Sequence, residues 1–328
     1  MSSSTESEKA LCIHSLNLFL ALGTGKAFYR ARYICAGCLP TIPRLTVHHI
    51  TSIDYSVVEN LLTRFLRDVL GKSGGRGYVV GVSGGLDSAT ALALATKSVG
   101  RDRVLALIMP DSRVTPGEDT EDAIALAEAL GVKYHIIEIS GAVDAIKRSI
   151  PIYEDDEKDR LPLGNLRARI RMCLLYYYAN KLGYLVLGTS DRSEYLIGYF
   201  TKYGDGASDV APLTLLYKTQ VRAFAKHLGV PSKIADKPSA PRLWRDHVAE
   251  EELGLSYTDI DLVLAAYVDL GLRVSDIPLA TGVDISVVEK VVKMVSSSEH
   301  KRRGPAVLGA ELLDTVRSMV ARNVGIVG

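Results

Sequence analysis

Residues 78–88 read Tyr-Val-Val-Gly-Val-Ser-Gly-Gly-Leu-Asp-Ser and are the most informative part of the sequence. The apolar start of this stretch predicts a buried parallel strand, and the run Ala89–Ser98 that follows predicts a helix. The turn between them is built of small residues and carries two hydroxyl groups and one carboxylate. Gly84 and Gly85 let the backbone lie close to a ligand, because glycine adopts backbone angles that are closed to other residues.

This turn predicts a phosphate site. Backbone N–H groups at the start of a helix have no partners within it, so they attract an anion, and the helix dipole adds to the attraction. Ser83 and Ser88 can donate hydrogen bonds to phosphate oxygens, and Asp87 can bind the magnesium ion that accompanies a polyphosphate. The alternative is an ordinary strand-to-helix turn with Ser88 or Asp87 as the N-cap residue. The turn is not a Walker loop, because no Gly-Lys-Ser/Thr ends it.

Further apolar runs predict the rest of the sheet. Strands are expected at 104–110, 134–139 and 184–188, with a short fifth strand at Leu213–Leu216. Since helical patterns separate the runs and no hairpin signal joins them, the strands should be parallel, with helices on both faces. The expected fold class is α/β, a doubly wound open parallel sheet of about five strands. Such sheets bind ligands at the carboxyl ends of their strands.

Two other segments carry specific expectations. The helix expected at 165–182 should turn Leu166, Ile170, Leu174 and Tyr177 inward, since these residues recur at helical spacing. Residues 231–254 contain several prolines and read as one long loop, which in a compact domain is typical of a lid.

Composition limits the partners and the location of the protein. The chain has 328 residues, 47% of them hydrophobic and 23% charged, with a formal net charge of +1, which is typical of a globular protein with one large domain or with one domain and appendages. The balanced charge argues against nucleic acid as a partner. Four cysteines at irregular spacing form no disulfide framework, and no apolar run reaches the ~18–20 residues of a membrane span. We therefore expect a cytoplasmic protein with no membrane contact.

The ends of the chain are harder to interpret. Residues 1–50 read as a poorly patterned extension, and 306–328 as a helical tail after the main domain at 51–305. Cys35 and Cys38 are a single pair, whereas a structural zinc ion needs four ligands. The pair therefore predicts no metal site by itself.

Four clusters follow the turn along the chain, and their order supports a family resemblance. They are Arg169 within Ala-Arg-Ile-Arg-Met, 189–194, 201–212, and His300-Lys301-Arg302. The turn itself resembles the signature of the PP-loop ATP pyrophosphatases, enzymes that cleave ATP between the α and β phosphates. Together with the four clusters it resembles ammonia-dependent NAD synthetase, from about Ile53 to Arg303. The stretch Phe200–Gly206 is the most specific part of this resemblance.

The resemblance implies a fold like that of the adenine-nucleotide α-hydrolases. It also implies ATP-dependent amidation of deamido-NAD to NAD by ammonia, through an acyl-adenylate, with release of AMP and pyrophosphate. The residues that it implies for ATP binding are Gly81, Val82, Ser83, Gly84, Gly85, Leu86, Asp87, Ser88, Thr189, Lys218 and Ser239. Those implied for deamido-NAD binding are Arg169, Lys202, Asp209, His300 and Lys301. Asp87 and Glu194 are implied as Mg²⁺ ligands and, with Lys218, as the catalytic residues. A homodimer is implied as well.

Each of these residues also has an ordinary structural interpretation. Arg169 is one of three arginines on its helix and could simply be solvated, and Glu194 could be an acid in the first turn of a helix. Rival functions are another adenylating PP-loop enzyme, acting in nucleotide amidation or tRNA thiolation, and a non-catalytic nucleotide sensor. The lid departs from the family pattern, because Pro241-Arg242 adds one residue and His247-Val248-Ala249-Glu250 stands where Gln-x-Asp-Glu is expected.

Overall fold

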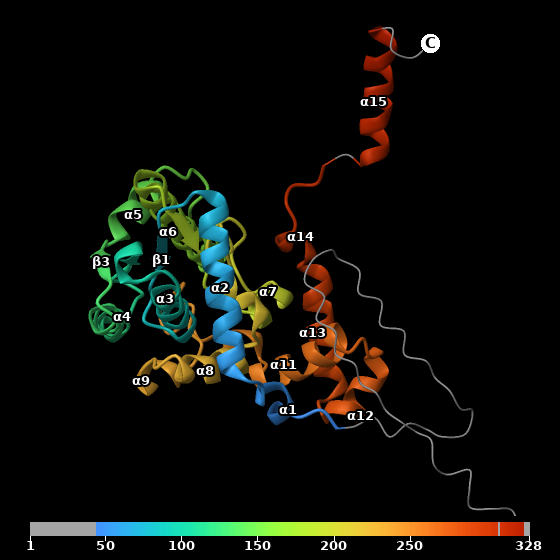
Figure 1. Ribbon diagram of the computed structural model, residues 1–328, viewed down its shortest axis with the longest axis horizontal. Coiled ribbons are helices and arrows are strands. Elements are labelled where there is room, and N and C mark those ends of the chain that lie inside the picture. Colours follow the sequence, from blue (N-terminus) through green and yellow to red (C-terminus); the bar gives the residue numbers. More distant parts are fainter. Residues whose placement is uncertain (1–43, 308, 325–328) are drawn as a thin grey trace, which may run out of the picture. The chain divides into compact units, whose positions relative to one another are not determined.

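The computed structural model describes residues 44–307 and 309–324 (Figure 1). The Cys35–Cys38 pair and most of the expected N-terminal extension therefore lie outside the described residues. Within the described ranges, no helix is long and apolar enough to cross a membrane.

A parallel sheet of four strands forms the centre of the described chain. The strands are β1 (Tyr78–Gly81), β2 (Val104–Ile108), β3 (Lys133–Ile136) and β4 (Leu185–Leu187), in the order β3-β2-β1-β4. In the register of the sheet, Tyr78 of β1 pairs with Val104 on one side and with Leu185 on the other. The chain thus leaves β1 in one direction for β2 and β3 and returns on the other side for β4. The order reverses between β1 and β4, which is the position where such sheets bind ligands.

The fifth strand expected at Leu213–Leu216 is wrong. Residues Pro212–Leu215 instead form a 3₁₀ helix, η4, and near them only Val210 makes an isolated parallel bridge to Leu187. Pro212 occupies the first turn of η4, where its missing N–H costs nothing. Leu213 is fully buried, so the apolar run reflects burial of a turn rather than strand pairing.

Helices make up most of the remaining structure. The helices before β4 are α1 (Val47–Thr51), α2 (Tyr55–Ser73), α3 (Leu86–Val99), α4 (Gly117–Ala129), α5 (Ser140–Lys147) and α6 (Arg160–Leu182), with 3₁₀ turns η2 (Arg101–Arg103) and η3 (Glu157–Asp159). Those after it are α7 (Arg192–Ile197), α8 (Lys218–His227), α9 (Ser232–Ala235), α10 (Ala249–Leu253), α11 (Tyr257–Leu264), the π-helical η5 (Ala265–Asp269), η6 (Val274–Asp276), α12 (Ile277–Thr281), α13 (Ile285–Ser297), α14 (Glu299–Arg302) and α15 (Ala310–Asn323).

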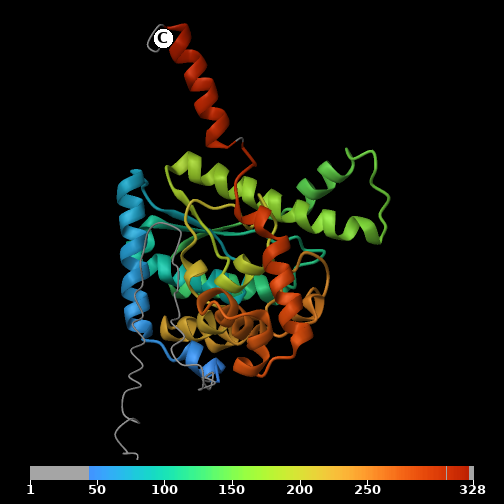
Figure 2. The same ribbon diagram turned by 90° about the vertical axis from the view of Figure 1, so that its right-hand side faces the viewer.

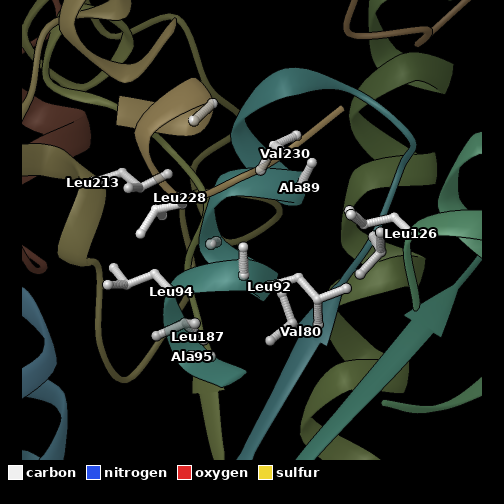
Figure 3. Packing of buried hydrophobic residues seen from close by; sticks show 14 of the residues in the cluster. Val80, Ala89, Leu92, Leu94, Ala95, Leu126, Leu187, Leu213, Leu228 and Val230 are labelled. Atoms are coloured by element: carbon white, nitrogen blue, oxygen red, sulfur yellow. The ribbon is translucent and has the colours of Figure 1, made fainter. Parts of the chain in front are cut away.

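The two faces of the sheet have separate apolar cores. Val80 packs with Leu92 and Leu126 from α3 and α4, as Figure 3 shows. Its neighbour Val79 packs on the opposite face with Ile170 of α6, because successive side chains of a strand point to opposite sides. Figure 2 shows α6 as the long yellow-green helix beside the strands. The α/β fold with helices on both faces of the sheet is therefore confirmed.

Two local expectations need correction. The stripe on α6 holds at Ile170, but Tyr177 is 60% exposed and Ala179 is buried instead. The expected loop at 231–254 contains α9 and α10, so the irregular part is confined to 236–248. Helices of four or five residues are shorter than two turns, so they leave no detectable period in a sequence. We call residues 236–248 the lid segment.

Candidate active site

A cavity of 740 Å³ lies at the carboxyl ends of the central strands. Its wall includes the turn after β1, residues that follow β2 and β4, and part of the lid segment. The residues that line it include Gly81, Val82, Ser83, Gly85, Leu86, Asp87, Ser88, Asp119, Arg171, Thr189, Glu194, Lys237, Ser239, Arg242 and Lys301. The cavity thus brings residues from both halves of the chain to the switch point of the sheet.

The turn after β1 is held by its own hydroxyl groups. Ser83 and Ser88 hydroxyl oxygens lie 3.0 Å apart, and the Ser88 hydroxyl also donates to the carbonyl of Gly85 over 3.1 Å. Helix α3 begins at Leu86, and its N-cap is Gly85 rather than Ser88 or Asp87. Because the N-cap residue has no side chain to accept from the first N–H groups, the helix start stays available to an anion.

Gly84 is required by two features of its position. Its φ is +78°, and a Cβ atom there would lie 2.0 Å from the carbonyl oxygen of Asp119. Gly84→Ala should therefore lower the free energy of unfolding by at least about 2 kcal/mol, since left-handed backbone alone costs ~1–2 kcal/mol. Urea unfolding measures the change.

Gly85→Ala is the matched control for that substitution. Gly85 has a φ of −94°, and an added Cβ would meet only the Ser83 hydroxyl, at 3.4 Å. The variant should lose less than about 1 kcal/mol, the cost of alanine at an N-cap position. Equal losses in the two variants would contradict the steric argument.

One lysine and three carboxylates form a cluster at the inner end of the cavity. The Lys218 ammonium lies 2.7 Å from Asp87 Oδ2, 2.8 Å from Asp191 Oδ2 and 2.8 Å from Glu194 Oε1. Each side chain is placed by the start of a helix: Asp87 in the first turn of α3, Glu194 in that of α7, and Lys218 in that of α8. Asp191 is the N-cap of α7 and accepts from the Glu194 N–H. The cluster thus draws together residues more than a hundred positions apart.

The charges of this cluster are unbalanced. Burial alone would lower the pKa of Lys218, but the Asp191, Asp87 and Glu194 carboxylates more than offset it and hold that pKa well above its ordinary value. Burial raises the pKa of Asp191 to about 6 and that of Glu194 well above its usual range, although Lys218 opposes both shifts. One ammonium cannot neutralise three carboxylates, so the cluster favours a further cation.

The same residues fit a magnesium ion. Ligand oxygens of Asp87, Asp191 and Glu194 all lie within 4.8 Å of one another. Asp87 Oδ1 is buried and, in the part of the chain that the structure describes, has no hydrogen-bond partner. Carboxylate oxygens are the ligands that Mg²⁺ prefers. Asp191 was not among the expected ligands, since Asp-x-x-Glu at a helix start is also typical of a capping pattern.

Asp261 contacts the chain neighbours of Glu194 and Lys218, and its burial makes the stability of the protein depend on pH. It is fully buried on α11, and its two oxygens accept from the Ser193 hydroxyl over 2.5 Å and from the Thr219 N–H over 2.9 Å. Burial raises the pKa of Asp261 to about 7. The unfolded pKa is about 3.9, so the folded state binds the proton more tightly and its stability falls as the pH rises between these values.

Asp261→Asn should remove that pH dependence. The amide can accept from the Thr219 N–H and donate to the Ser193 hydroxyl oxygen, so both contacts have a replacement. Relative to the unaltered protein, the variant should gain on the order of 3 kcal/mol of stability between pH 4 and pH 8. Urea unfolding of both proteins across this range measures the difference, and parallel curves would refute the prediction.

The structure brings most of the residues implied for ATP to the cavity wall. Those that line it are Gly81, Val82, Ser83, Gly85, Leu86, Asp87, Ser88, Thr189 and Ser239. Gly84 and Lys218 do not line it, because Gly84 faces α4 and Lys218 lies behind the carboxylates. Both still act on the cavity, one through the shape of the turn and the other through charge.

The residues implied for deamido-NAD are divided between two places. Lys301 lines the cavity and donates to the carbonyls of Gly198 and Phe200. The other four residues do not line it: Arg169 donates to the Lys202 carbonyl, Lys202 to the His300 carbonyl, and Asp209 accepts from the Val186 N–H. Arg169, Lys202 and His300 thus form a basic group beside the cavity rather than within it.

Arg171 is a cavity residue that the sequence did not single out. Its Nε donates to the Met109 carbonyl, and burial lowers the pKa of this guanidinium to about 10. It lies two residues from the exposed Arg169, on another side of α6. Three arginines within five residues gave no signal for choosing between them, because the choice depends on which face of α6 meets the sheet.

The fold and the turn define an ATP-binding protein of the PP-loop class. The sequence matches the family described as NAD synthase over residues 58–305, and the chain belongs to this family. It is 57% identical over 263 residues to the NH(3)-dependent NAD(+) synthetase of Aeropyrum pernix, covering 80% of this chain and 92% of that protein. It is 51% identical over 262 residues to the enzyme of that name from Hyperthermus butylicus, covering 80% and 94%.

Solved structures agree with this placement. The chain resembles the structure of an NMN synthetase from Francisella tularensis with a TM-score of 0.68 and 32% identity, over 79% of this chain and 100% of that one. It resembles the NH3-dependent NAD synthetase of Campylobacter jejuni with a TM-score of 0.66 and 30% identity, over 79% and 100%.

Proposed function

We infer that the protein is a ligase that amidates deamido-NAD to NAD with ammonia and ATP, releasing AMP and pyrophosphate. The observation that carries this conclusion is the uncapped start of α3 facing the same cavity as the Asp87–Glu194 carboxylates, in a chain 57% identical to a named synthetase. ATP and its products suit such a site, because the helix start attracts an anion and the carboxylates attract a cation.

The chemistry follows from the difficulty of making an amide. A carboxylate does not react with ammonia directly, because the oxide leaving group is too poor. The nicotinate carboxylate therefore attacks the α-phosphate of ATP and forms an acyl-adenylate, and pyrophosphate leaves toward the N–H groups of the turn. Ammonia then attacks the acyl carbon, and AMP departs with the electron pair of the broken C–O bond. The residues supply position and charge, so no nucleophilic side chain is needed.

Asp87 and Glu194, with Asp191 beside them, would hold Mg²⁺. When bound, this ion neutralises polyphosphate charge and stabilises the departing pyrophosphate. Lys218 keeps the three carboxylates together and keeps one positive charge close to them. Thr189 and Ser239, from the end of β4 and the lid segment, would complete the ATP contacts.

The finer assignments are part of the same proposal. Lys301, with Arg169, Lys202, Asp209 and His300, would bind deamido-NAD. Because most of this set lies outside the cavity of one chain, the dinucleotide would extend beyond it, toward the second subunit of a homodimer. We further propose a catalytic domain at 51–305, a helical tail at 306–328 and a cytoplasmic location, where ATP and ammonia are available.

The substrate and the nitrogen source are tested in one assay. Purified protein is given ATP and Mg²⁺ with deamido-NAD or nicotinate mononucleotide, and with ammonium or glutamine. We expect NAD from deamido-NAD and ammonium, and little product with glutamine. Faster amidation of the mononucleotide, as the name of the Francisella tularensis relative suggests, would reassign the substrate and keep the chemistry. If no amide product forms from either deamido-NAD or nicotinate mononucleotide, the proposal is contradicted.

A further inference from the structure

The carboxylates beside the turn after β1 repel a polyphosphate unless cations offset their charge. Asp87, Asp191 and Glu194 share one ammonium, that of Lys218, which lies within 2.8 Å of all three. Lys218 is therefore committed to the carboxylates, and a divalent cation would just offset the remaining two charges. ATP brings further negative charge, so cations from another element are needed to bind its outer phosphates.

The lid segment supplies two such cations beside the turn. The Lys237 ammonium donates to Asp119 Oδ1 over 2.8 Å and to the carbonyl of Gly84 over 3.2 Å, and it lies 2.6 Å from Asp122 Oδ2. Arg242 donates from Nε to Asp119 Oδ2 over 3.1 Å. Both cations line the cavity, and one carboxylate, Asp119, binds the two together. The lid is thus fastened to α4 by an anion at the edge of the phosphate-binding turn.

The backbone of Arg242 points to the same relationship. Its φ is +53°, in the left-handed region that residues other than glycine seldom adopt. Such a conformation costs free energy and persists where neighbouring contacts impose it, often at a ligand site. In this conformation Arg242 pairs with Asp119, which holds the guanidinium against α4. Arg242 belongs to the residue pair that this chain has where the family has one residue fewer.

We propose that Lys237 and Arg242 bind the β and γ phosphates of ATP. Until ATP binds, the Asp119 carboxylate occupies the position of these phosphates between the two cations. This inference rests on the proposed use of ATP. A polyphosphate in the turn replaces the Asp119 carboxylate as the anion shared by the two cations, because it offers more charge and more acceptor oxygens. The lid is then held by the substrate itself. After the α–β bond is cleaved, the same two cations hold the pyrophosphate.

The proposal is tested by whether one substitution raises or lowers the affinity for ATP. Asp119→Asn removes the competing anion, so the affinity for Mg²⁺-ATP and for Mg²⁺-pyrophosphate should rise at least threefold, measured by calorimetry. Lys237→Met and Arg242→Met should each weaken both ligands about tenfold. Binding of AMP, which lacks the outer phosphates, should not change in any of the three variants. If Asp119 were only an anchor that shapes the lid, Asp119→Asn would weaken binding instead.

Two controls separate the contact from general charge effects. Glu121→Gln removes the same charge from the same helix, at an exposed residue that does not line the cavity. Lys97→Met removes a cation from a surface ion pair with Glu59. Neither should change ATP affinity by more than about twofold. In the Arg242→Met background, the gain from Asp119→Asn should shrink, as a double-mutant cycle would show.

The outcomes distinguish this inference from the proposed function. Weaker or unchanged ATP binding in Asp119→Asn, or an equal gain in Glu121→Gln, would overturn the inference alone, provided that the unaltered protein binds ATP and forms NAD. An unaltered protein that does not bind Mg²⁺-ATP would contradict both.

Discussion

Lys218→Met should destabilise the protein by about 3–5 kcal/mol and abolish NAD formation. The substitution keeps an unbranched side chain but leaves the fully buried Asp191 and the partly buried Asp87 and Glu194 without their ammonium. A buried charge that loses its partner costs this much, and solvent cannot reach Asp191 to compensate. Urea unfolding measures the loss, which should grow as the pH rises from 5 to 8, because protonated carboxyl groups do not need the lysine.

The control for Lys218→Met is Lys97→Met, which breaks a surface ion pair with Glu59 and should cost less than about 1 kcal/mol. Addition of Mg²⁺ should restore part of the stability of Lys218→Met, since a divalent cation can replace the missing charge. A Lys218→Met protein that unfolds at the same urea concentration as the unaltered one would show that the lysine does not hold the carboxylates together.

Asp87→Ala should abolish most of the activity but leave the stability of the protein intact. Pyrophosphate release should fall by at least about 10³-fold, because a carboxylate next to the departing phosphates is lost together with its cation. The fold should be retained, with no fall in melting temperature. Asp87 is one of three acids around a single ammonium, so its removal relieves repulsion within the cluster. Such exchanges of activity for stability are common at active sites.

Pyrophosphate release and thermal unfolding of the same preparation test this prediction. Asp68→Ala, which removes an acid from an exposed i,i+4 pair with Arg64, is the control and should leave both measurements unchanged. Full activity in Asp87→Ala would contradict the assigned role of Asp87. A fall of many degrees in its melting temperature would contradict the charge argument.

The sequence predicted the parts of the fold that depend on local pattern. The strand–turn–helix unit around 78–98 was recognisable because its apolar strand, its glycines and its helical run are adjacent in the chain. The parallel sheet followed from the alternation of such units. Leu213–Leu216 was mistaken for a strand because a short apolar run is the same pattern whether it is buried in a strand or in a turn.

The candidate site was less accessible to sequence reasoning, because its contacts join distant residues. Nothing in the segment around Lys218 reveals that its ammonium meets Asp87 and Asp191. The resemblance to a family supplied Asp87, Glu194 and Lys218 as candidates. It supplied neither the burial that shifts the pKa values nor the third carboxylate, Asp191. Those features arise only when α3, α7 and α8 begin at one place.

In the lid segment, too, the sequence showed which residues differ from the family but not what they contact. Its added residue was visible in the sequence, and so was the replacement around His247. The partners of these residues were not. His247 is buried, and its Nε2 lies 3.1 Å from the Tyr199 hydroxyl and 2.8 Å from Glu252 Oε2. Its ring also stacks on that of Trp244, with ring centroids 3.6 Å apart. A segment that departs from its family can therefore still be firmly packed.

The central claim is that the turn after β1 binds the outer phosphates of ATP while the bond between the α and β phosphates is cleaved. The direct measurement is which adenine nucleotide, AMP or ADP, is formed from ATP for each NAD. The protein is supplied with ATP, deamido-NAD and ammonium in the presence of Mg²⁺. Separation of the nucleotides by chromatography should give one AMP and one pyrophosphate for each NAD. Formation of ADP and phosphate in their place would mean that the bond between the β and γ phosphates is cleaved, and would contradict the account.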